Sequence, residues 1–239
     1  MLTARQLTKT YGRVKALDGL DLEVGSGEVL CLLGPNGAGK TTTLHLFLGL
    51  LRPTSGTALV KGVDVATQPI AARRHLAYVP EQAQLYPHLS GLENLGYFLS
   101  LALASPPPPE RLHALLREAG LPAEAITRPV SGYSKGMRQK VVLALALARQ
   151  AEVLLLDEPT SGLDPVSIRE LGLLIKRLSA QGAAVLMVTH DLGTVRAVAH
   201  RVGVMKAGRL VELAPAASLS EADLELLYWK HFERQDAPA

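Results

Sequence analysis

Residues 34–41 read Gly-Pro-Asn-Gly-Ala-Gly-Lys-Thr, a complete match to the pattern G-x-x-x-x-G-K-[ST]. An apolar stretch, residues 28–33, precedes this octapeptide, and a stretch of helical character begins at Thr41. A glycine-rich turn between a strand and a helix can point several backbone N–H groups at one anion, and the helix N-terminus adds positive potential there. We therefore predict a loop that binds the phosphates of a nucleoside triphosphate. The alternative is a glycine-rich turn without a ligand.

Two side chains of this loop have separate predicted tasks. Lys40 supplies a mobile positive charge for the β- and γ-phosphates, and the Thr41 hydroxyl can bind Mg²⁺. The expected ligands at this point are a nucleoside triphosphate and Mg²⁺. The residues predicted to bind the nucleotide here are Gly34, Pro35, Asn36, Gly37, Ala38, Gly39, Lys40, Thr41 and Thr42.

Composition limits the class of protein. The chain has 239 residues, of which 48% are hydrophobic and 20% charged, as expected of one globular domain that can bury a core. The net charge is only +3, and although the pI is near 9.0, the chain has no Lys/Arg run and no basic stripe with aromatics. We expect no nucleic-acid partner.

Cysteine usage and hydropathy bear on location. The single cysteine, Cys31, cannot form an intrachain disulfide, which suits a reducing compartment, and the first residues lack the layout of a secretion signal. The densest apolar stretch, residues 141–148, is eight residues long, well short of the ~18 that span a bilayer. The expectation is a cytoplasmic protein, or one that docks on a membrane component.

Hydrophobic patterning predicts a mixed α/β fold. Residues 1–33 alternate apolar and polar positions, as half-buried antiparallel strands do, and residues 56–65 and 75–80 continue that character. Residues 90–148 are mostly helical in pattern, with leucines every three or four positions. We predict an antiparallel β subdomain at the N-terminus and a helical subdomain over residues 84–150.

The last third of the chain alternates strand and helix. Residues 153–156 and 184–189 are uninterrupted apolar runs, typical of parallel strands covered on both faces, and residues 166–179 form a helix of crossover length. Residues 202–213 predict a hairpin, and residues 214–239 a helical tail. The whole chain, residues 1–239, is predicted to be one domain built on a parallel sheet.

Acidic residues follow the first of these apolar runs. Asp157 can hold Mg²⁺, usually through water, and Glu158 is placed to orient or deprotonate an attacking water. The alternative is that both carboxylates only cap the next helix. His190 ends the parallel run at 184–189 and could reach a γ-phosphate oxygen, although a lone histidine there is often structural.

A second anion-binding end is predicted at residues 131–140. Ser134 and Gly136 stand at the start of a helix, whose N-terminal N–H groups can bind an anion. If this helix end faced the phosphate loop of its own chain, it would be a redundant second anion-binding site. It makes sense if it faces the nucleotide of a partner chain.

Together these motifs resemble the nucleotide-binding subunit of ATP-binding-cassette transporters over essentially the whole length. The matching segments, in the family's order, are residues 34–41, Pro-Glu-Gln ending at Gln82, Tyr-Ser-Lys-Gly-Met at 133–137, residues 153–158, Ser-Gly-Leu-Asp at 161–164, and His190. The resemblance implies a P-loop ATPase core with a parallel sheet. It also implies an enzyme that hydrolyses ATP while coupled to transmembrane transport.

The resemblance assigns roles to individual residues. Tyr11 matches the aromatic that stacks on adenine, and Gln82 matches the residue that senses Mg²⁺ and the attacking water and relays nucleotide state to the membrane partner. Glu158 matches the catalytic base and His190 the γ-phosphate switch. The signature Ser134, Lys135, Gly136 and Met137 matches the segment that closes over ATP in the other subunit, and Asp164 matches the loop that couples the two sites. The implied Mg²⁺ set is Thr41, Gln82 and Asp157.

One departure from the family pattern is informative. The commonest signature is Leu-Ser-Gly-Gly-Gln, whereas this chain has Tyr-Ser-Lys-Gly-Met, which is similar to cassettes that serve export-type transporters. The implied partners are an integral membrane permease subunit and a second cassette, with a homodimer expected, on the cytoplasmic face of the cell membrane. Two alternatives stay open: a soluble cassette ATPase acting on nucleic acid or ribosomes, and an ATP-gated regulatory module that does not hydrolyse ATP.

Overall fold

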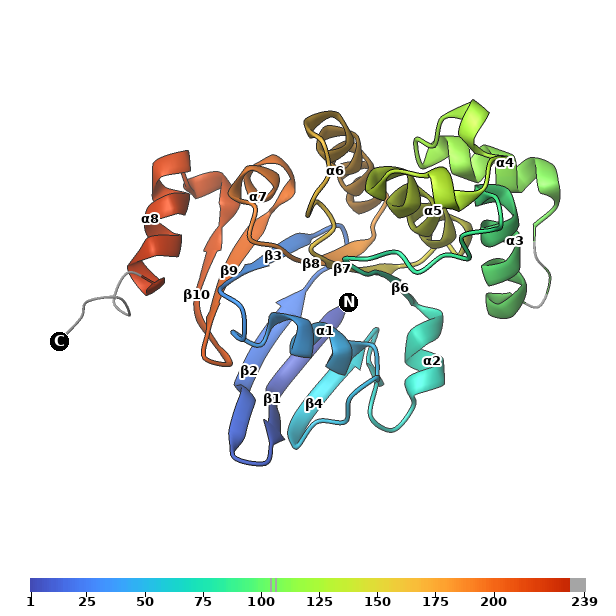
Figure 1. The fold of residues 1–239 in the computed structure, drawn as a ribbon. Coiled ribbons are helices and arrows are strands. Elements are labelled where there is room, and N and C mark those ends of the chain that lie inside the picture. Colours follow the sequence, from blue (N-terminus) through green and yellow to red (C-terminus); the bar gives the residue numbers. More distant parts are fainter. Residues whose placement is uncertain (104, 106, 233–239) are drawn as a thin grey trace.

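The computed structural model describes residues 1–103, 105 and 107–232. Two β-sheets and the helices that cover them form the framework (Figure 1). The strands are β1 (Leu2–Tyr11), β2 (Val14–Val24), β3 (Val29–Leu33), β4 (Ser55–Val60), β5 (Val63–Asp64), β6 (Leu76–Val79), β7 (Val153–Asp157), β8 (Ala184–Val188), β9 (Arg201–Lys206) and β10 (Arg209–Pro215). The helices are α1 (Lys40–Phe47), α2 (Pro69–Arg74), α3 (Gly91–Ala102), α4 (Pro109–Glu118), α5 (Lys135–Ala148), α6 (Pro165–Ala180), α7 (Leu192–Val198) and α8 (Glu221–Phe232).

The two sheets differ in strand direction. The smaller sheet has the order β2-β1-β4-β5 and is antiparallel throughout. The larger has the order β10-β9-β3-β8-β7-β6, parallel from β9 to β6, with β10 antiparallel at one edge. An antiparallel N-terminal sheet beside a parallel one confirms the predicted α/β class, and β9 and β10 confirm the predicted hairpin.

Side chains of the central strands alternate between two cores. Cys31 and Leu154 pack into the core on the side of helices α3 to α6. Leu30 and Leu155 pack into the core shared with the smaller sheet and α1. Each of these strands is buried at every position, which explains why the parallel strands are apolar without interruption.

The expectation of antiparallel strands throughout residues 1–33 is wrong for the last of them. β3 lies in the larger sheet, parallel to β8 and β9, whereas β1 and β2 pair antiparallel as predicted. β6, which the sequence grouped with the N-terminal strands, is parallel to β7. The physical reason is composition: Val-Leu-Cys-Leu-Leu offers no polar position for a solvated face, so β3 needs cover on both sides.

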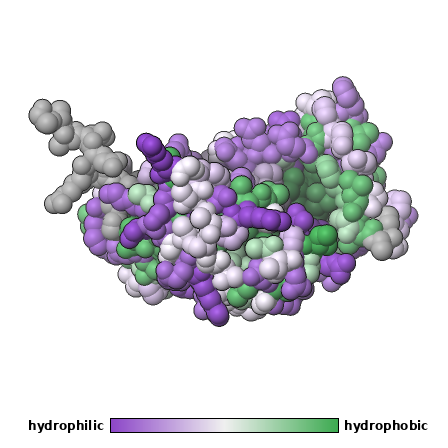
Figure 2. Space-filling model, turned by 90° about the horizontal axis from the view of Figure 1, so that it is seen from below, coloured by the Kyte–Doolittle hydropathy of each residue, from purple (hydrophilic) through white to green (hydrophobic). Residues whose placement is uncertain are grey.

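Helices α3 to α6 form a layer on the far side of the larger sheet from the smaller one, and α1 lies between the two sheets (Figure 1). Side chains cap the starts of α3 and α6: Ser90 forms a capping box with Glu93 at α3, and Asp164 caps α6. Seen from below, the molecule is hollowed on the side of α3 and α4, and hydrophobic residues gather there (Figure 2).

Among residues 1–103, 105 and 107–232, no helix combines the length and the apolar character that a bilayer span requires. Of the predicted tail over residues 214–239, the structure shows α8. Residues 233–239 lie outside the described part of the chain.

Gly56 offers a test of how tightly the smaller sheet is built. It has φ +77°, and an added Cβ would lie 2.1 Å from the Gln6 carbonyl oxygen. Gly62 has a similar φ, +79°, but open space around it. We predict that Gly62→Ala lowers the free energy of unfolding by about 1–2 kcal/mol, the cost of a left-handed alanine. Gly56→Ala should cost a further ~1–3 kcal/mol, because backbone must move. Urea denaturation followed by circular dichroism measures both, and equal losses would contradict the prediction.

Candidate functional site

The predicted phosphate-binding loop leaves the carboxyl end of β3 and enters α1. Beside it lies a cleft of about 490 Å³, lined by residues 35–42 together with Val14, Lys15, Ala16 and Ala207. Gly39, the residue before the helix, has φ +100°, and an added Cβ would lie 2.6 Å from the Ala16 carbonyl oxygen. Glycine is required here because the loop turns in a left-handed conformation directly against β2.

Lys40 lies inside the loop rather than in solvent. Its side chain is almost fully buried, and Nζ donates hydrogen bonds to the carbonyl oxygens of Gly34 at 2.6 Å and Pro35 at 3.1 Å. Burial lowers the pKa of Lys40, while the nearby carboxylates of Glu158 and Asp157 raise it. The ammonium group is therefore placed between the loop and the two acidic residues that end β7, where phosphate charge would be compensated.

Asp157 ends β7 within reach of two hydroxyl groups. The Thr41 hydroxyl donates to Oδ1 at 3.4 Å, and the Tyr78 hydroxyl donates to Oδ2 at 3.3 Å. Burial raises the pKa of Asp157, and the Tyr78 hydrogen bond opposes that effect. A hydroxyl and a carboxylate supply the oxygen ligands that Mg²⁺ prefers, so Thr41 and Asp157 could hold this ion. Among the described residues, no group of three or more His, Cys, Asp or Glu side chains could by itself hold a metal ion.

Glu158 and His190 face each other across two neighbouring strands. The Nδ1 atom of His190 lies 2.9 Å from Oε2 of Glu158, and the His190 backbone N–H donates to the same oxygen at 3.3 Å. Glu158 has φ +46°, a strained conformation for a residue other than glycine that the surrounding structure must hold in place. The helix-capping alternative fails, because Asp164 caps α6 by accepting from the N–H groups of Val166 and Ser167.

The four signature residues lie at the start of α5. Ser134 caps the helix, with its hydroxyl accepting from the Met137 N–H at 3.2 Å, and Lys135 begins the first turn. Gly136 is packed against α6, since an added Cβ would lie 3.0 Å from Ser167 Oγ. The structure thus places a helix N-terminus where the sequence predicted one, and shows in addition that Ser134 caps it.

Tyr11 and Gln82 are both exposed. Tyr11 ends β1, just before the residues of β2 that line the cleft, and Lys9 Nζ lies 5.0 Å from its ring centroid. Gln82 follows β6, the neighbour of β7, and so leaves the same edge of the sheet as Asp157.

Sequence reasoning missed part of this site. Tyr78 was read only as part of a strand, although its hydroxyl contacts Asp157. Val14, Lys15, Ala16 and Ala207 also line the cleft without belonging to a motif. The one signal for Tyr78 was a hydroxyl within an apolar strand four residues before Gln82. No local signal identified the others, because they reach the cleft through the packing of β2 and the β9–β10 turn against the loop.

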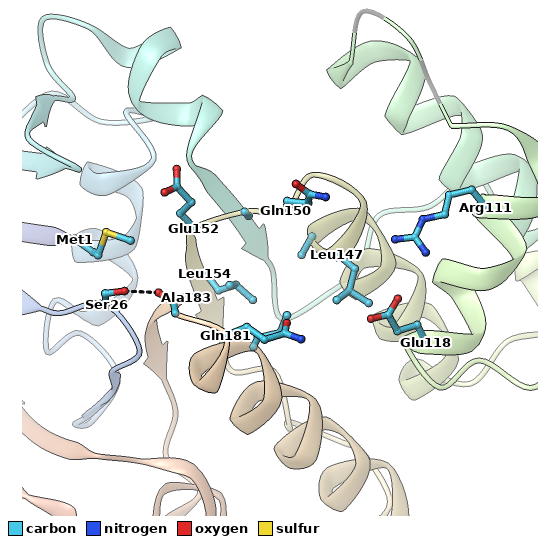
Figure 3. Close-up of a pocket in the computed structure, with 14 residues that line it drawn as sticks. Met1, Ser26, Arg111, Glu118, Leu147, Gln150, Glu152, Leu154, Gln181 and Ala183 are labelled. Atoms are coloured by element: carbon cyan, nitrogen blue, oxygen red, sulfur yellow. Dashed lines mark hydrogen bonds between the residues drawn. The ribbon is translucent and has the colours of Figure 1, made fainter.

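A second cavity lies away from the phosphate loop. It has a volume of about 450 Å³ and is bordered by residues at the amino-terminal ends of β7 and β8, among them Glu152 and Ala183. Figure 3 shows Arg111 and Glu118 entering it from α4, and the hydrogen bond from Ser26 to the Gly182 carbonyl at 2.7 Å on its other side. Since ligands of parallel sheets bind at the carboxyl ends of the strands, this cavity is separate from the candidate nucleotide site.

Comparison with known proteins gives a consistent result. The profile of the ABC transporter family matches residues 17–161. The probable multidrug ABC transporter ATP-binding protein YbhF of Escherichia coli K12 is 36% identical over 212 residues, 88% of this chain and 36% of the relative. The Nod factor export ATP-binding protein I of Cupriavidus metallidurans is 37% identical over 227 residues, 94% of this chain and 74% of the relative. The chain thus spans about a third of one relative and about three quarters of the other.

Solved structures agree with the fold. An ATP-binding subunit of an ABC transporter superposes with a TM-score of 0.83 at 30% identity, covering 95% of this chain and 98% of that one. A dimeric ATP-binding cassette in a post-hydrolysis state, bound to ADP and Pi, superposes with a TM-score of 0.82 at 28% identity, covering 90% and 99%. The architecture is that of an ATPase cassette.

The Tyr78–Asp157 hydrogen bond yields a measurable pKa effect. Because the Tyr78 hydroxyl stabilises the ionised carboxylate, Tyr78→Phe should raise the pKa of Asp157 further, and Asp157 should titrate at a higher pH than in the wild type. Carbon-13 NMR titration of the aspartate carboxyl carbons measures this, with Asp157→Asn assigning the resonance. Tyr133→Phe is the control, since its hydroxyl donates to the Ala125 carbonyl instead. An unchanged Asp157 titration in Tyr78→Phe would refute the assignment.

Proposed function

Since the chain belongs to the ABC transporter family, we propose that it is the ATP-binding and ATP-hydrolysing subunit of an export-type transporter, acting on the cytoplasmic face of the membrane through a separate permease subunit. The observation that supports this most directly is the arrangement at one sheet edge. There, Lys40 of the phosphate loop lies near Asp157, and Glu158 faces His190. Each of these side chains performs a distinct task in phosphoryl transfer to water.

In this proposal the phosphate loop holds the nucleotide. The N–H groups of residues 34–41 and the positive end of α1 bind the phosphates, while Lys40 moves from the loop carbonyls to the β- and γ-phosphate oxygens. Thr41, Asp157 and Gln82 would hold Mg²⁺, which would neutralise charge that develops on the phosphates. Tyr11 stacks on the adenine.

Hydrolysis is assigned to Glu158 and His190. Glu158 accepts a proton from the attacking water as the water's oxygen bonds to the γ-phosphorus, while the bond from that phosphorus to the β,γ-bridging oxygen breaks and ADP leaves. The contact of 2.9 Å between Glu158 Oε2 and His190 Nδ1 fixes the carboxylate beside the strand ends. In this role His190 orients the base and contacts a γ-phosphate oxygen.

A second cassette completes the site. We propose that the N-terminus of α5, with Ser134, Lys135, Gly136 and Met137, closes over ATP bound to the other subunit, and that Asp164 couples the two sites. Ser134 is exposed at a capped helix N-terminus, a position where N–H groups are available to phosphate. A homodimer would bind two nucleotides head to tail.

We assign the contact with the permease subunit to an aromatic surface on the helical layer. We call this surface the Tyr86 cluster and define it as Tyr86, Tyr97 and Phe98. The ring centroids of Tyr86 lie 5.0 Å from Tyr97 and 5.9 Å from Phe98. Tyr86 and Tyr97 are exposed by 48% and 41%, and Leu101 beside them on α3 by 69%. Exposed, mutually packed aromatics are typical anchors of protein interfaces.

Glu158→Gln tests the catalytic assignment. The variant keeps the shape of the side chain but cannot accept a proton, so we expect the ATPase rate to fall at least about 100-fold while ATP binding and ATP-dependent dimerisation persist. Phosphate release and size-exclusion chromatography measure these. Glu152→Gln, at the other end of β7, is the matched control and should keep the wild-type rate. Near wild-type hydrolysis by Glu158→Gln would exclude Glu158 as the base.

Capture from native membranes tests the transport assignment. Tagged Glu158→Gln, trapped with MgATP and solubilised, should recover one polytopic membrane protein in stoichiometric amount. Adding Tyr97→Ala should reduce recovery while Leu173→Ala, at an exposed leucine of α6, should not. In the wild-type background, Tyr97→Ala should keep its basal ATPase. Recovery of only soluble proteins or nucleic acid would overturn the transporter assignment.

A further inference from the structure

Glu81, the residue before Gln82, connects three segments that are distant in the sequence. Its Oε1 accepts a hydrogen bond from Ser161 Oγ at 3.2 Å. The Lys135 ammonium lies 3.9 Å from the same oxygen. Ser161 belongs to the loop between Glu158 and Asp164, and Lys135 is the first residue of α5. One carboxylate thus joins the Gln82 loop, the loop that follows the catalytic carboxylate, and the signature helix.

A second contact lies beneath this one. Gln139, one turn further along α5, is 2% exposed, and its Nε2 donates to the Pro80 carbonyl oxygen at 2.9 Å. Residues four apart on a helix share a face, so Lys135 and Gln139 both face the segment Pro80–Glu81. Within the described part of the chain, Oε1 of Gln139 has no hydrogen-bond partner. The hydrogen bond from Nε2 therefore ties α5 to the segment that leads into Gln82.

In the common signature, Ser-Gly-Gly, a glycine stands at the position of Lys135. A glycine has no side chain and could not make the contact with Glu81. Its stem lies against Gly162, where an added Cβ would be 3.6 Å from Lys135 Cδ and 3.7 Å from Nζ. The side chain therefore runs along the loop after Glu158 before it reaches Glu81. This packing holds the ammonium near the carboxylate, although 30% of the Lys135 side chain and 49% of the Glu81 side chain are exposed.

We propose that the Glu81 junction, defined as Glu81, Lys135, Ser161 and Gln139, couples the position of Gln82 to the position of α5, the signature helix. This inference rests on the proposed function, since it assigns Gln82 and the signature to nucleotide sensing. A displacement of α5 pulls on Pro80 through Gln139 and on Glu81 through Lys135. The junction members are positioning residues: they act on the reaction through Gln82 and the loop after Glu158.

The test compares two ion pairs made by lysines of α5, one that belongs to the Glu81 junction and one that lies outside it. Glu81→Gln removes the junction pair, and Glu170→Gln removes the 2.7 Å pair between Lys140 of the same helix and Glu170, whose side chain is 48% exposed. We expect Glu81→Gln to lower kcat by about 2–5-fold, the range of an exposed ion pair, with the ATP dissociation constant changed less than 2-fold. Glu170→Gln should keep the wild-type kcat.

A charge exchange separates the junction from any direct contact of Lys135 with a partner's nucleotide. Glu81→Lys and Lys135→Glu should each lower kcat, and the double variant should recover at least half of the loss. A positive charge needed at position 135 for the nucleotide would leave the double variant as slow as Lys135→Glu. Thermal unfolding of every variant identifies those that fail to fold.

The inference is overturned if Glu81→Gln and Glu170→Gln change kcat equally, or if the exchange restores nothing in folded protein. These assays need no membrane partner, so they are independent of the membrane capture experiment. An absence of ATPase in the wild type would instead contradict the proposed function itself.

Discussion

The register of three parallel strands determines where the chemistry of this protein takes place. Leu32 of β3 and Asp157 of β7 are both paired with Val188 of β8. The Thr189 N–H donates to the Leu32 carbonyl, and the Glu158 N–H to the Val188 carbonyl. The phosphate loop, the two acidic residues and the histidine therefore leave the sheet at one level. A one-residue slip of β7 would turn every side chain to the opposite face and separate Asp157 from Thr41.

This convergence brings opposite charges together in a partly desolvated site. Burial alone would favour a neutral lysine and a protonated aspartate, as the directions of the Lys40 and Asp157 pKa values show. The carboxylates of Glu158 and Asp157 offset part of the desolvation of Lys40, and the hydroxyls of Tyr78 and Thr41 stabilise the charged form of Asp157. The site is thus arranged to receive a ligand that carries both signs, as a nucleotide with its divalent cation does.

How far the sequence predicts this structure depends on how local each feature is. The loop at 34–41 is readable because its glycines, lysine and threonine act within one turn, and the buried strands because both faces must be apolar. The alternation in residues 1–33 misled at β3, since the pairing partner of a strand is decided by segments more than 150 residues away. Tyr78, Ala16 and Ala207 were invisible for the same reason: they reach the site through tertiary packing.

The signature helix illustrates what lies beyond motif reading. As a motif, its first turn is an anion-binding end directed at another chain. In the fold, the same helix contacts its own chain, through Lys135 in its first turn to Glu81 and through Gln139, one turn further along, to Pro80. A single exposed ion pair contributes little to stability. It can still bias the position of a loop, because a small free-energy difference is enough to shift the equilibrium between two loop arrangements of similar free energy. In the proposed function, the helix that closes over the partner's nucleotide is also the helix that contacts the Gln82 loop, and this would give the two sites a direct physical connection.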